Sequence, residues 1–513
     1  MTERQATASC AALGEQLWSP TASNGAFLSY LCYEGENGPY WIAGRQGPEC
    51  KTFTADGTQS QQPCLDLLPA LCTQSAPLAN ATYADNSTKW QTTVSTGAQT
   101  LTGFRDKFSF RFEGVRYAAE PERWTYSTVY NGTGHSDALA FGPECVQGGN
   151  AGSTDCLFLN IWTPSLPKSN NTAAEKLKPV LFWIHAGSAY ATTYSSYLTI
   201  SQEVALAAEP ILNATGCLNA TSQLACLRAV DPFVLANVTT PARYLVVDGT
   251  YLVTNQLEVT GRGPAAHVPV LMGFMRDDGA AFITYPTPNE TVSGLLTANG
   301  FNLSAISTLS VFPEPISANQ TLNIFNTSAL IATDAEFRCL DEATAYSAVK
   351  HAVFPTVYFY EFNRSYQLSF YQPNAPTCEA PPSAAHPYGD PSAEYFKCHS
   401  GELYYVFGTL LFNGQPPRDD YEIPMSQFTL DSWAAFARTY DPTPSAGFLQ
   451  ARGFVNTSTE IARSGVPWTP VTEGDLGLRL MQYPSVEEGF GIYDGQAECE
   501  ALGYPIDYCE SHS

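Results

Sequence analysis

The chain has 513 residues and a formal net charge of −24, which comes from 25 Lys and Arg against 49 Asp and Glu. A chain this acidic repels phosphate backbones and anionic lipid surfaces, so nucleic acid is excluded as an expected partner. No apolar run is long enough to span a bilayer, so no integral membrane segment is expected. The length and the 44% hydrophobic content suit one large core with an appended region.

The cysteines and the glycosylation sequons point to an extracellular protein. The chain has 14 cysteines, which are too many for an ordinary cytosolic enzyme, and no Cys/His spacing is that of a zinc site. We therefore expect disulfides, no metal and no cofactor. Asn-x-Ser/Thr sequons occur at Asn80, Asn86, Asn131, Asn170, Asn213, Asn219, Asn237, Asn289, Asn302, Asn319, Asn326, Asn363 and Asn456. Secretion is predicted, although the first residues, MTERQATASC, contain no apolar segment of a signal peptide.

Residues 1–102 form the first predicted region, a cysteine-rich N-terminal extension. Its Gly, Ser and Thr content predicts loops, and its cysteines predict disulfides that hold these loops together. The cysteines of this region are Cys10, Cys32, Cys50, Cys64 and Cys72. Because five is an odd number, we expect at least one of them to pair with a cysteine elsewhere in the chain.

Residues 103–513 form the second predicted region, in which elements can be assigned. Apolar and polar residues alternate over 108–112, which predicts a strand with one buried face. Residues 180–184 (VLFWI) are apolar throughout, which is typical of a strand buried on both faces of a mostly parallel sheet. The run ends in small residues at 185–188, whose backbone N–H groups can point into open space.

The hydrophobic periodicity of later segments predicts one helix and two strands. Residues 199–212 have a helical pattern, and the segments 267–282 and 357–365 each contain a strand. The first of these strands ends in an Asp-Asp-Gly turn that includes Asp278. A Pro-rich loop spans 373–391.

Several motifs resemble those of the type-B carboxylesterase and lipase family, an α/β-hydrolase group. The segment FSFRFEGVRYAAEPERW (108–124) resembles the opening F-x-G-I-P-Y-A-x-P-P-x-R-F of that family. The segments SDALAFGPECVQ (136–147) and STDCLFLNIWTP (153–164) resemble its two cysteine motifs. The segment KCHSGELYYVFG (397–408) resembles H-G-x-E-x-x-F-V-F-G. The resemblance covers about residues 103–495 and is closest to the secreted fungal carboxylesterases and lipases.

The resemblance implies the fold and most of the site. It implies an α/β-hydrolase, with a mostly parallel sheet flanked by helices. It places His399 as the catalytic base and Asp278 as the acid that orients the base, at a position where the family usually has Glu. Gly187 and Ser188 stand where the family has the glycines of its oxyanion hole, and Ser188 tolerates the needed backbone angles less readily than Gly.

The resemblance also implies two disulfides. One joins Cys145 to Cys156 and closes a small loop. The other joins Cys217 to Cys226, within a segment that resembles the family's G-C…C-L-R motif. The connectivity of the other cysteines stays open.

The nucleophile elbow G-x-S-x-G, which follows the oxyanion turn in the family, is absent from this sequence. At about 30 residues per βα unit, roughly a hundred residues that include central strands are missing near 187–190. Three serine-containing stretches do not replace the elbow. In residues 134–138 (GHSDA), consecutive side chains point apart and cannot form a triad. Ser188 lacks the glycine flanks of an elbow, and the pair Ser195 and Ser196 has no elbow context.

Three functional hypotheses follow. The first is a secreted carboxylic ester hydrolase that acts on small-molecule or lipid esters through Ser-His-Asp chemistry, and whose nucleophile this chain has lost, so that it is inactive. The second is a non-catalytic, cholinesterase-like extracellular protein used for binding or adhesion. The third is a rearranged esterase that uses Ser188. The oligomeric state stays open.

The missing strands also bear on stability. Their loss would leave backbone groups of neighbouring strands unpaired, at about 1–3 kcal/mol each, against a total stability of about 5–15 kcal/mol. We therefore expect that this chain alone does not form a stable hydrolase domain.

Overall fold

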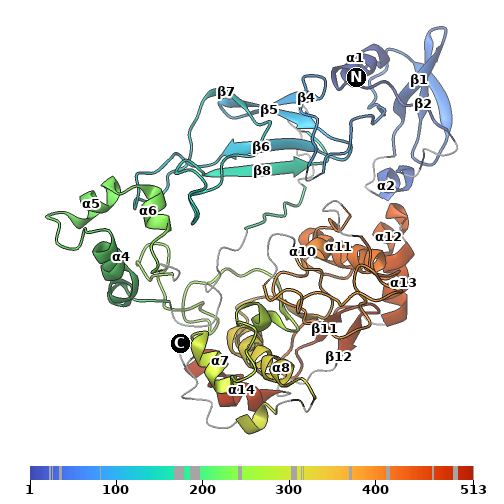
Figure 1. Ribbon diagram of the computed structural model, residues 1–513. Coiled ribbons are helices and arrows are strands. Elements are labelled where there is room, and N and C mark those ends of the chain that lie inside the picture. The colour runs from blue at the N-terminus through green and yellow to red at the C-terminus, as the bar shows by residue number, and fades with distance from the viewer. Residues whose placement is uncertain are drawn as a thin grey trace. The chain divides into compact units, whose positions relative to one another are not determined.

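The computed structural model describes residues 1–21, 25, 27–33, 37–80, 82–166, 178–184, 197–240, 245–301, 309–313, 315, 317–368, 373–411, 416–453, 455–464, 467–488 and 495–511. The chain forms two compact units (Figure 1). The first holds Met1–Lys178, Ser201–Ala242 and Gln450–Gly453, and the second holds Pro179–Ile200, Arg243–Leu449 and Phe454–Ser513. No helix in the described ranges is both long and apolar enough to cross a bilayer.

The first unit begins with two helices and a small antiparallel sheet. The helices are α1 (Glu3–Ala12) and α2 (Leu28–Tyr33). The sheet has the order β1 (Tyr40–Gln46), β2 (Glu49–Phe53) and β3 (Gln59–Pro63). The disulfides Cys10–Cys72 and Cys50–Cys64 lie in this region. Cys10, Cys50 and Trp41 are fully buried in one cluster, so the disulfides are part of a small core.

Cys32 corrects the expectation that one cysteine of this region pairs elsewhere. It is exposed and free, and its Sγ donates a hydrogen bond to Oδ1 of Asn37 at 3.2 Å. The other free cysteine is Cys509, which is buried in the second unit. The odd count therefore reflects one unpaired thiol in each unit and not a disulfide that leaves the N-terminal region.

A five-stranded sheet follows in the first unit. Its order is β4 (Gln91–Thr96), β5 (Gln99–Arg105), β6 (Phe110–Arg116) and β8 (Phe158–Thr163), with β7 (Gly134–Asp137) parallel to β5. The strand predicted from the alternation at 108–112 is confirmed as β6, in which Phe112 is buried, whereas Phe108 before it is 65% exposed. β5 crosses the boundary drawn at residue 102, because β4 and β5 pair as an antiparallel hairpin. The sheet therefore begins before residue 103.

The helical pattern near residues 199–212 is confirmed. α3 (Ile200–Glu203), a π-helical segment (Val204–Ala208) and α4 (Glu209–Ala214) follow one another, and α5 (Gln223–Ala229) and α6 (Pro232–Ala236) come next. The disulfide Cys217–Cys226 joins the turn after α4 to α5, and the disulfide Cys145–Cys156 lies between β7 and β8. These are the two pairs that the sequence motifs implied.

The second unit is built on a four-stranded sheet in the order β12 (Val486–Glu488), β11 (Leu478–Met481), β10 (Val357–Phe362) and β9 (Val270–Met275). β9, β10 and β11 are parallel, and β12 is antiparallel to β11. β9 and β10 confirm the strands predicted within 267–282 and 357–365. Among the described strands, β9 pairs with β10 alone, so it forms an edge of this sheet.

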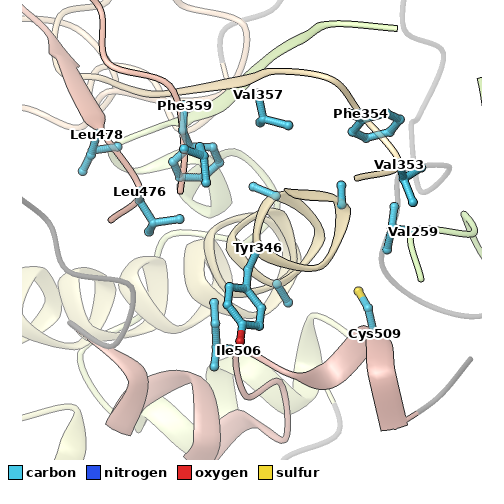
Figure 2. Packing of buried hydrophobic residues seen from close by; sticks show 14 of the residues in the cluster. Val259, Tyr346, Val353, Phe354, Val357, Phe359, Leu476, Leu478, Ile506 and Cys509 are labelled. Atoms are coloured by element: carbon cyan, nitrogen blue, oxygen red, sulfur yellow. The ribbon is translucent and has the colours of Figure 1, made fainter. Parts of the chain in front are cut away.

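The main core of the second unit lies between this sheet and α9 (Cys339–Lys350) (Figure 2). Tyr346 of α9 points away from the strands toward Ile506, while Val357 and Phe359 of β10 cover the opposite side of the helix. Because every residue of α9 from Cys339 to Ala348 is buried, the helix lies within the unit and not on its surface.

The remaining helices complete the second half of the chain. They are α7 (Val292–Ala298), α8 (Gln320–Thr333), α10 (Leu403–Val406), α11 (Glu422–Thr439), α12 (Ala446–Arg452), α13 (Val455–Ser464), α14 (Gln496–Leu502) and α15 (Tyr508–Ser511). A π-helical segment, Asp334–Arg338, connects α8 to α9. The disulfide Cys339–Cys499 joins the start of α9 to α14.

Residues 180–184 correct the expectation of a buried strand. They form no strand, and their side chains are exposed, from 52% at Trp183 to 83% at Val180. A strand buried on both faces needs a neighbouring strand at each edge and helices over both faces. In the described ranges no strand pairs with these residues, so the apolar run is left in solvent.

Candidate active site

Asp278 is held immediately after β9. It opens a short 3-10 turn, Asp278–Ala281, and its side chain is buried, with the residue 4% exposed. Its Oδ2 accepts a hydrogen bond from the backbone N–H of Met275 at 2.8 Å. One carboxylate oxygen therefore fixes the side chain to the end of the strand, and the other is left to contact a second group.

Gly279 explains how the Asp278 turn lies so close to α8. A Cβ at Gly279 would lie 2.3 Å from the backbone nitrogen of Thr333, a distance that no real side chain tolerates. The backbone N–H of Gly279 donates a hydrogen bond to Oγ1 of Thr333 at 3.0 Å. Glycine is required here by the close approach of two backbones, and the contact fixes the turn that bears Asp278.

His399 lies beside Asp278, although the two residues are 121 positions apart. Its Nδ1 is 2.5 Å from Oδ1 of Asp278. The ring of Phe282 meets the imidazole edge-on at a centroid distance of 5.1 Å, and that of Phe337 lies at 5.6 Å. The sequence motifs named both members of this pair, and the structure brings them into hydrogen-bond contact.

The backbone after His399 is strained. Ser400 has a φ of +67°, a left-handed conformation that residues other than glycine rarely adopt. Such strain persists only where the surrounding structure holds the backbone, and it is concentrated at functional sites. The turn directs the chain from His399 into α10 within a few residues.

A cavity of about 400 Å³ adjoins the pair, and both His399 and Asp278 line it. β9 contributes apolar side chains to its wall, and Phe337, Phe354 and Tyr360 add aromatic ones. Two further carboxyl groups, those of Asp341 and Glu402, also line it. A half-open, mostly apolar space of this size can hold an uncharged organic group next to the imidazole.

The charges around His399 determine its protonation. Burial lowers the pKa of His399, but the carboxylate of Asp278, with smaller contributions from Glu402 and Glu336, outweighs burial and raises the pKa above its ordinary value. The direction is that expected of an imidazole that donates a hydrogen bond to a carboxylate. The imidazole therefore takes up a proton more readily than a free histidine does.

The pKa values of the neighbouring carboxyl groups are raised as well, which for an acid favours the neutral form. Burial raises the pKa of Glu402 to about 7, and the charge of Asp278 adds to the rise. Burial and Asp278 likewise raise the pKa of Glu336 to about 7. Burial raises the pKa of Asp341 well above its ordinary value. Near neutral pH, the cavity therefore carries less negative charge than its residue composition implies.

Of the serine-containing stretches named from the sequence, the structure describes residues 134–138 alone. Gly187, Ser188, Ser195 and Ser196 lie outside the described residues, as does the expected deletion near 187–190. Residues 134–138 largely form β7, where His135 Nε2 contacts Oγ1 of Thr102 at 2.6 Å and Ser136 accepts a hydrogen bond from Gln99. His135 and Ser136 are thus engaged with β5, in the first unit, as an ordinary strand pair.

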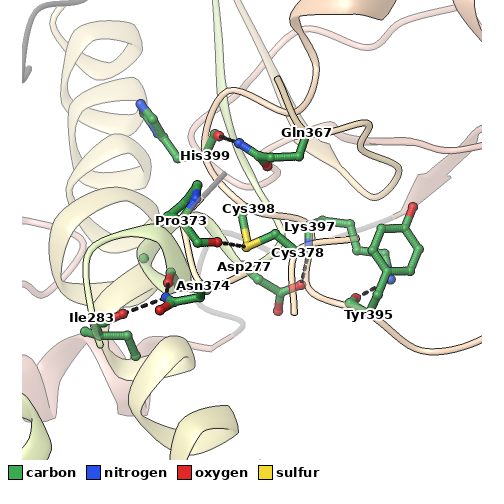
Figure 3. The surroundings of a disulfide bond; sticks show 12 residues. Asp277, Ile283, Gln367, Pro373, Asn374, Cys378, Tyr395, Lys397, Cys398 and His399 are labelled. Carbon is green, nitrogen blue, oxygen red and sulfur yellow. Dashed lines mark hydrogen bonds between the residues drawn. A yellow bond between two sulfur atoms is a disulfide. The ribbon is translucent and has the colours of Figure 1, made fainter. Parts of the chain in front are cut away.

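Further residues that surround the pair carry no recognisable sequence motif. Cys398, next to His399, forms a disulfide with Cys378, and Asn374 donates two hydrogen bonds to the turn after Asp278 (Figure 3). The only signal in the sequence was a cysteine inside the Pro-rich loop and a second cysteine beside the histidine. No group of His, Cys, Asp and Glu within the described ranges is arranged to hold a metal ion.

The parallel sheet, the carboxylate after β9 and the histidine before α10 define an α/β-hydrolase. The chain belongs to the carboxylesterase family, because the model of that family matches residues 91–200 and 196–486. Phenmedipham hydrolase of Pseudarthrobacter oxydans is 35% identical over 109 residues, which cover 18% of this chain and 21% of that protein. The chain thus matches about a fifth of the length of that curated relative.

Solved structures agree on the fold. A PNB esterase has a TM-score of 0.55 at 17% identity, and a second structure of a PNB esterase has a TM-score of 0.57 at 16% identity. A thermophilic PNB esterase has a TM-score of 0.56 at 16% identity. Each comparison covers 80% of this chain and 99% of the other. At this identity, the similarity establishes the α/β-hydrolase fold alone.

Proposed function

We propose that the chain is a carboxylic ester hydrolase by descent, with His399 as its base and Asp278 as its acid, that lacks the nucleophilic serine and hydrolyses no ester as it stands. The observation that carries the proposal is the 2.5 Å contact between His399 Nδ1 and Asp278 Oδ1 beside a mostly apolar cavity. Family membership supplies the reaction class, and small-molecule or lipid esters are the proposed substrates of the complete enzyme.

The geometry supports different roles for the two nitrogens of His399 and for Asp278. A carboxylate only accepts hydrogen bonds, so the Nδ1 that faces Asp278 carries the proton of the neutral imidazole. Nε2 is then unprotonated and can take a proton from a hydroxyl group, and Asp278 stabilises the imidazolium that forms. In a complete site, that hydroxyl would belong to a serine at a nucleophile elbow, which this sequence does not contain.

Loss of the nucleophile removes the covalent step altogether. Without a serine there is no acyl-enzyme, and the backbone N–H after the serine is lost from the oxyanion hole. The test is hydrolysis of p-nitrophenyl acetate and p-nitrophenyl butyrate by this chain, with His399→Gln as the matched control. The two proteins should show equal rates. Hydrolysis that depends on His399 would contradict the proposed inactivity.

A rearranged esterase that uses Ser188 is the competing enzyme hypothesis. It requires that Ser188→Ala abolish hydrolysis and that a serine-directed fluorophosphonate label this residue. We expect neither, because the Ser188 segment lacks the glycine flanks that let an elbow turn sharply. Labelling of Ser188, located by peptide mass spectrometry, would favour this hypothesis over ours.

We also propose that the protein acts outside the cell. Six disulfides support this, since such bonds form and persist in oxidising compartments. The dense sequons support it as well. Expression from the native host should yield protein in the medium whose mass falls on treatment with an N-glycosidase. Unglycosylated protein retained in the cytosol would refute this part of the proposal.

A non-catalytic extracellular binding protein is the alternative function. The absence of the nucleophile favours it, because such a protein needs the fold and not the serine. Against it stands the retained His399–Asp278 contact, which a binding protein has no need to keep. If the transcript encodes the chain as it is and the protein melts cooperatively, the alternative is preferred.

A further inference from the structure

One loop contacts the backbone on both sides of the His399–Asp278 pair. In this loop, Asn374 donates a hydrogen bond from Nδ2 to the carbonyl of Ala280 at 2.7 Å and another to that of Ile283 at 2.6 Å. Ala280 belongs to the turn that Asp278 opens, and Ile283 follows it. The side-chain amide of Asn374 therefore holds the backbone that follows Asp278 (Figure 3).

The same loop is tied to the base's side four residues later. Cys378 forms a disulfide with Cys398, the residue that immediately precedes His399. Both cysteines are buried, at 1% and 0% exposed. The backbone N–H of Phe396 also donates to the carbonyl of Thr377 at 3.1 Å. The segment that precedes His399 is thus fixed to the loop by a covalent bond and a backbone hydrogen bond.

A direct backbone contact completes the arrangement. Asp277 N–H donates to the carbonyl of Lys397 at 3.2 Å, and the N–H of Lys397 donates to Oδ2 of Asp277 at 2.8 Å. Asp277 immediately precedes Asp278, and Lys397 lies two residues before His399. The segments that precede Asp278 and His399 therefore lie side by side. The loop from Asn374 to Cys378 links the turn after Asp278 to the residue before His399.

We propose that Asn374 and the Cys378–Cys398 disulfide are positioning residues, which together form a clamp that sets the separation of Asp278 from His399. The catalytic meaning of this clamp rests on the proposed function, but its geometry does not. The clamp is defined as Asn374, Cys378 and Cys398.

The shortness of aspartate gives the clamp a physical purpose. Asp278 is one methylene shorter than the glutamate that the family usually has, so the two backbones must approach more closely for the same contact. Hydrogen bonds from N–H to oxygen have donor–acceptor distances of about 2.7–3.2 Å, and a contact stretched to about 3.6 Å is no longer one. Supporting contacts must hold catalytic groups within about 0.5 Å of the productive geometry. The clamp draws the turn after Asp278 and the segment before His399 to a single loop, which limits how far they can separate.

A purely structural loop predicts something different. If the loop only fills space, its removal lowers thermal stability and leaves the environment of His399 unchanged in the protein that remains folded. If it positions the pair, its removal weakens the contact with Asp278. The pKa of His399 then falls, because the carboxylate that raises it has moved away.

The test measures His399 itself and needs no catalysis. The rate at which diethyl pyrocarbonate modifies His399 is followed against pH by peptide mass spectrometry in the full chain, which has 7 histidines that peptides can resolve. The rate profile gives the pKa of each imidazole. The same chain in urea gives the unfolded reference.

Two variants remove the clamp, each with a matched control. Asn374→Gly deletes the donating amide, and glycine accepts the positive φ of +53° at this position without added strain. Its control is Asn237→Gly in the first unit, since Asn237 also donates from Nδ2 to a backbone carbonyl, that of Phe233 at 2.7 Å. The double variant Cys378→Ala with Cys398→Ala removes the disulfide, and Cys50→Ala with Cys64→Ala, in the first unit, is its control.

In the parent chain, we expect His399 to have a pKa above that in urea. Both clamp variants should lower it by at least about one unit, the effect of losing an adjacent carboxylate, and the two controls should leave it unchanged. An unchanged value in both clamp variants would overturn the clamp and leave the proposed function standing. A parent value equal to that in urea would mean that the pair does not form, which would overturn the clamp and the proposed base and acid together.

Discussion

Nδ1 of His399 lies 2.5 Å from Oδ1 of Asp278, and each residue is held by contacts of its own. Asp278 is fixed by the N–H of Met275, and the imidazole contacts the rings of Phe282 and Phe337, which stack on each other at 5.8 Å. A chance contact between a surface histidine and an aspartate would not be supported from several elements. The proposed base and acid are therefore in contact in a chain whose sequence contains no G-x-S-x-G elbow.

The contact itself can be tested by substitution of Asp278. Asp278→Asn keeps the size of the side chain and removes its charge, so the pKa of His399 should fall by about 1–3 units. Glu336→Gln should lower it less, because Glu336 contributes least among the carboxylates that raise it. Titration of the imidazole Cε1 proton by NMR measures both. A larger effect from Glu336→Gln than from Asp278→Asn would contradict the geometry.

The Cys339–Cys499 disulfide should stabilise the second unit. It closes a loop of 160 residues and joins α9, the buried helix of the core, to α14. Its removal by Cys339→Ala with Cys499→Ala should destabilise that unit by about 2–5 kcal/mol, measured by urea unfolding. The control is Cys50→Ala with Cys64→Ala, which opens a separation of 14 residues in the first unit and should leave the second unit's transition in place. Equal effects on that transition would refute the prediction.

Stability should fall as pH rises from about 5 to 8. Burial raises the pKa of Glu336, Glu342 and Glu402 to about 7, above the ordinary value of 4.5. The folded chain therefore binds more protons than the unfolded chain in this range, and stability decreases with pH wherever that holds. The raised pKa of His399 has the same sign, since its contribution is present below the unfolded value and is lost as pH rises through the folded one.

One buried base acts in the opposite direction at higher pH. Burial lowers the pKa of Lys397 to about 8, so its contribution to stability grows only as pH rises above that value. Differential scanning calorimetry at pH 5.5 and pH 8 tests the effect of the carboxyl groups. Because their pKa values are raised, the melting temperature should be lower at pH 8. A melting temperature that rises over this interval would contradict the raised pKa values of these carboxyl groups.

The exposed run at residues 180–184 should promote aggregation. Leu181, Phe182 and Ile184 are 62%, 69% and 77% exposed, and contiguous apolar side chains in solvent associate with those of other molecules. The triple variant Leu181→Ser, Phe182→Ser, Ile184→Ser should reduce aggregation, followed by light scattering, and leave the melting temperature unchanged. Trp183 is kept, because its ring contacts Phe407 at 5.1 Å. A large fall in melting temperature would show that the run is buried in solution.

The same run shows where sequence reasoning reached its limit. Its apolar pattern predicts a strand correctly by local criteria, but a strand also needs partners, and partners are a property of the rest of the chain. His399 and Asp278 were identified because each carries a recognisable flank, whereas their 2.5 Å contact required the fold. The Cys378–Cys398 pair was missed because 14 cysteines allow far more pairings than spacing can decide. Asn374 belongs to no recognisable sequence motif, so its contact with the turn after Asp278 could not be predicted.

The expectation that the chain forms no stable hydrolase domain alone stays a prediction. β9 is a sheet edge among the described strands, and partly buried carboxyl groups line the cavity beside it. Both features raise the free energy of the folded chain, since unpaired backbone and desolvated acids are each costly. Binding of the dye ANS together with a broad thermal transition would agree with this expectation. A sharp, cooperative transition without dye binding would refute it.

The central claim is that a segment with the nucleophile is missing from a chain that keeps the base and the acid. Sequencing the source transcript across the codons for Trp183 to Tyr194 tests it most directly. We predict a longer product that encodes an additional strand followed by G-x-S-x-G. A transcript that encodes this chain without any insertion would contradict the claim, and the His399–Asp278 pair would then be a remnant in a protein with another role.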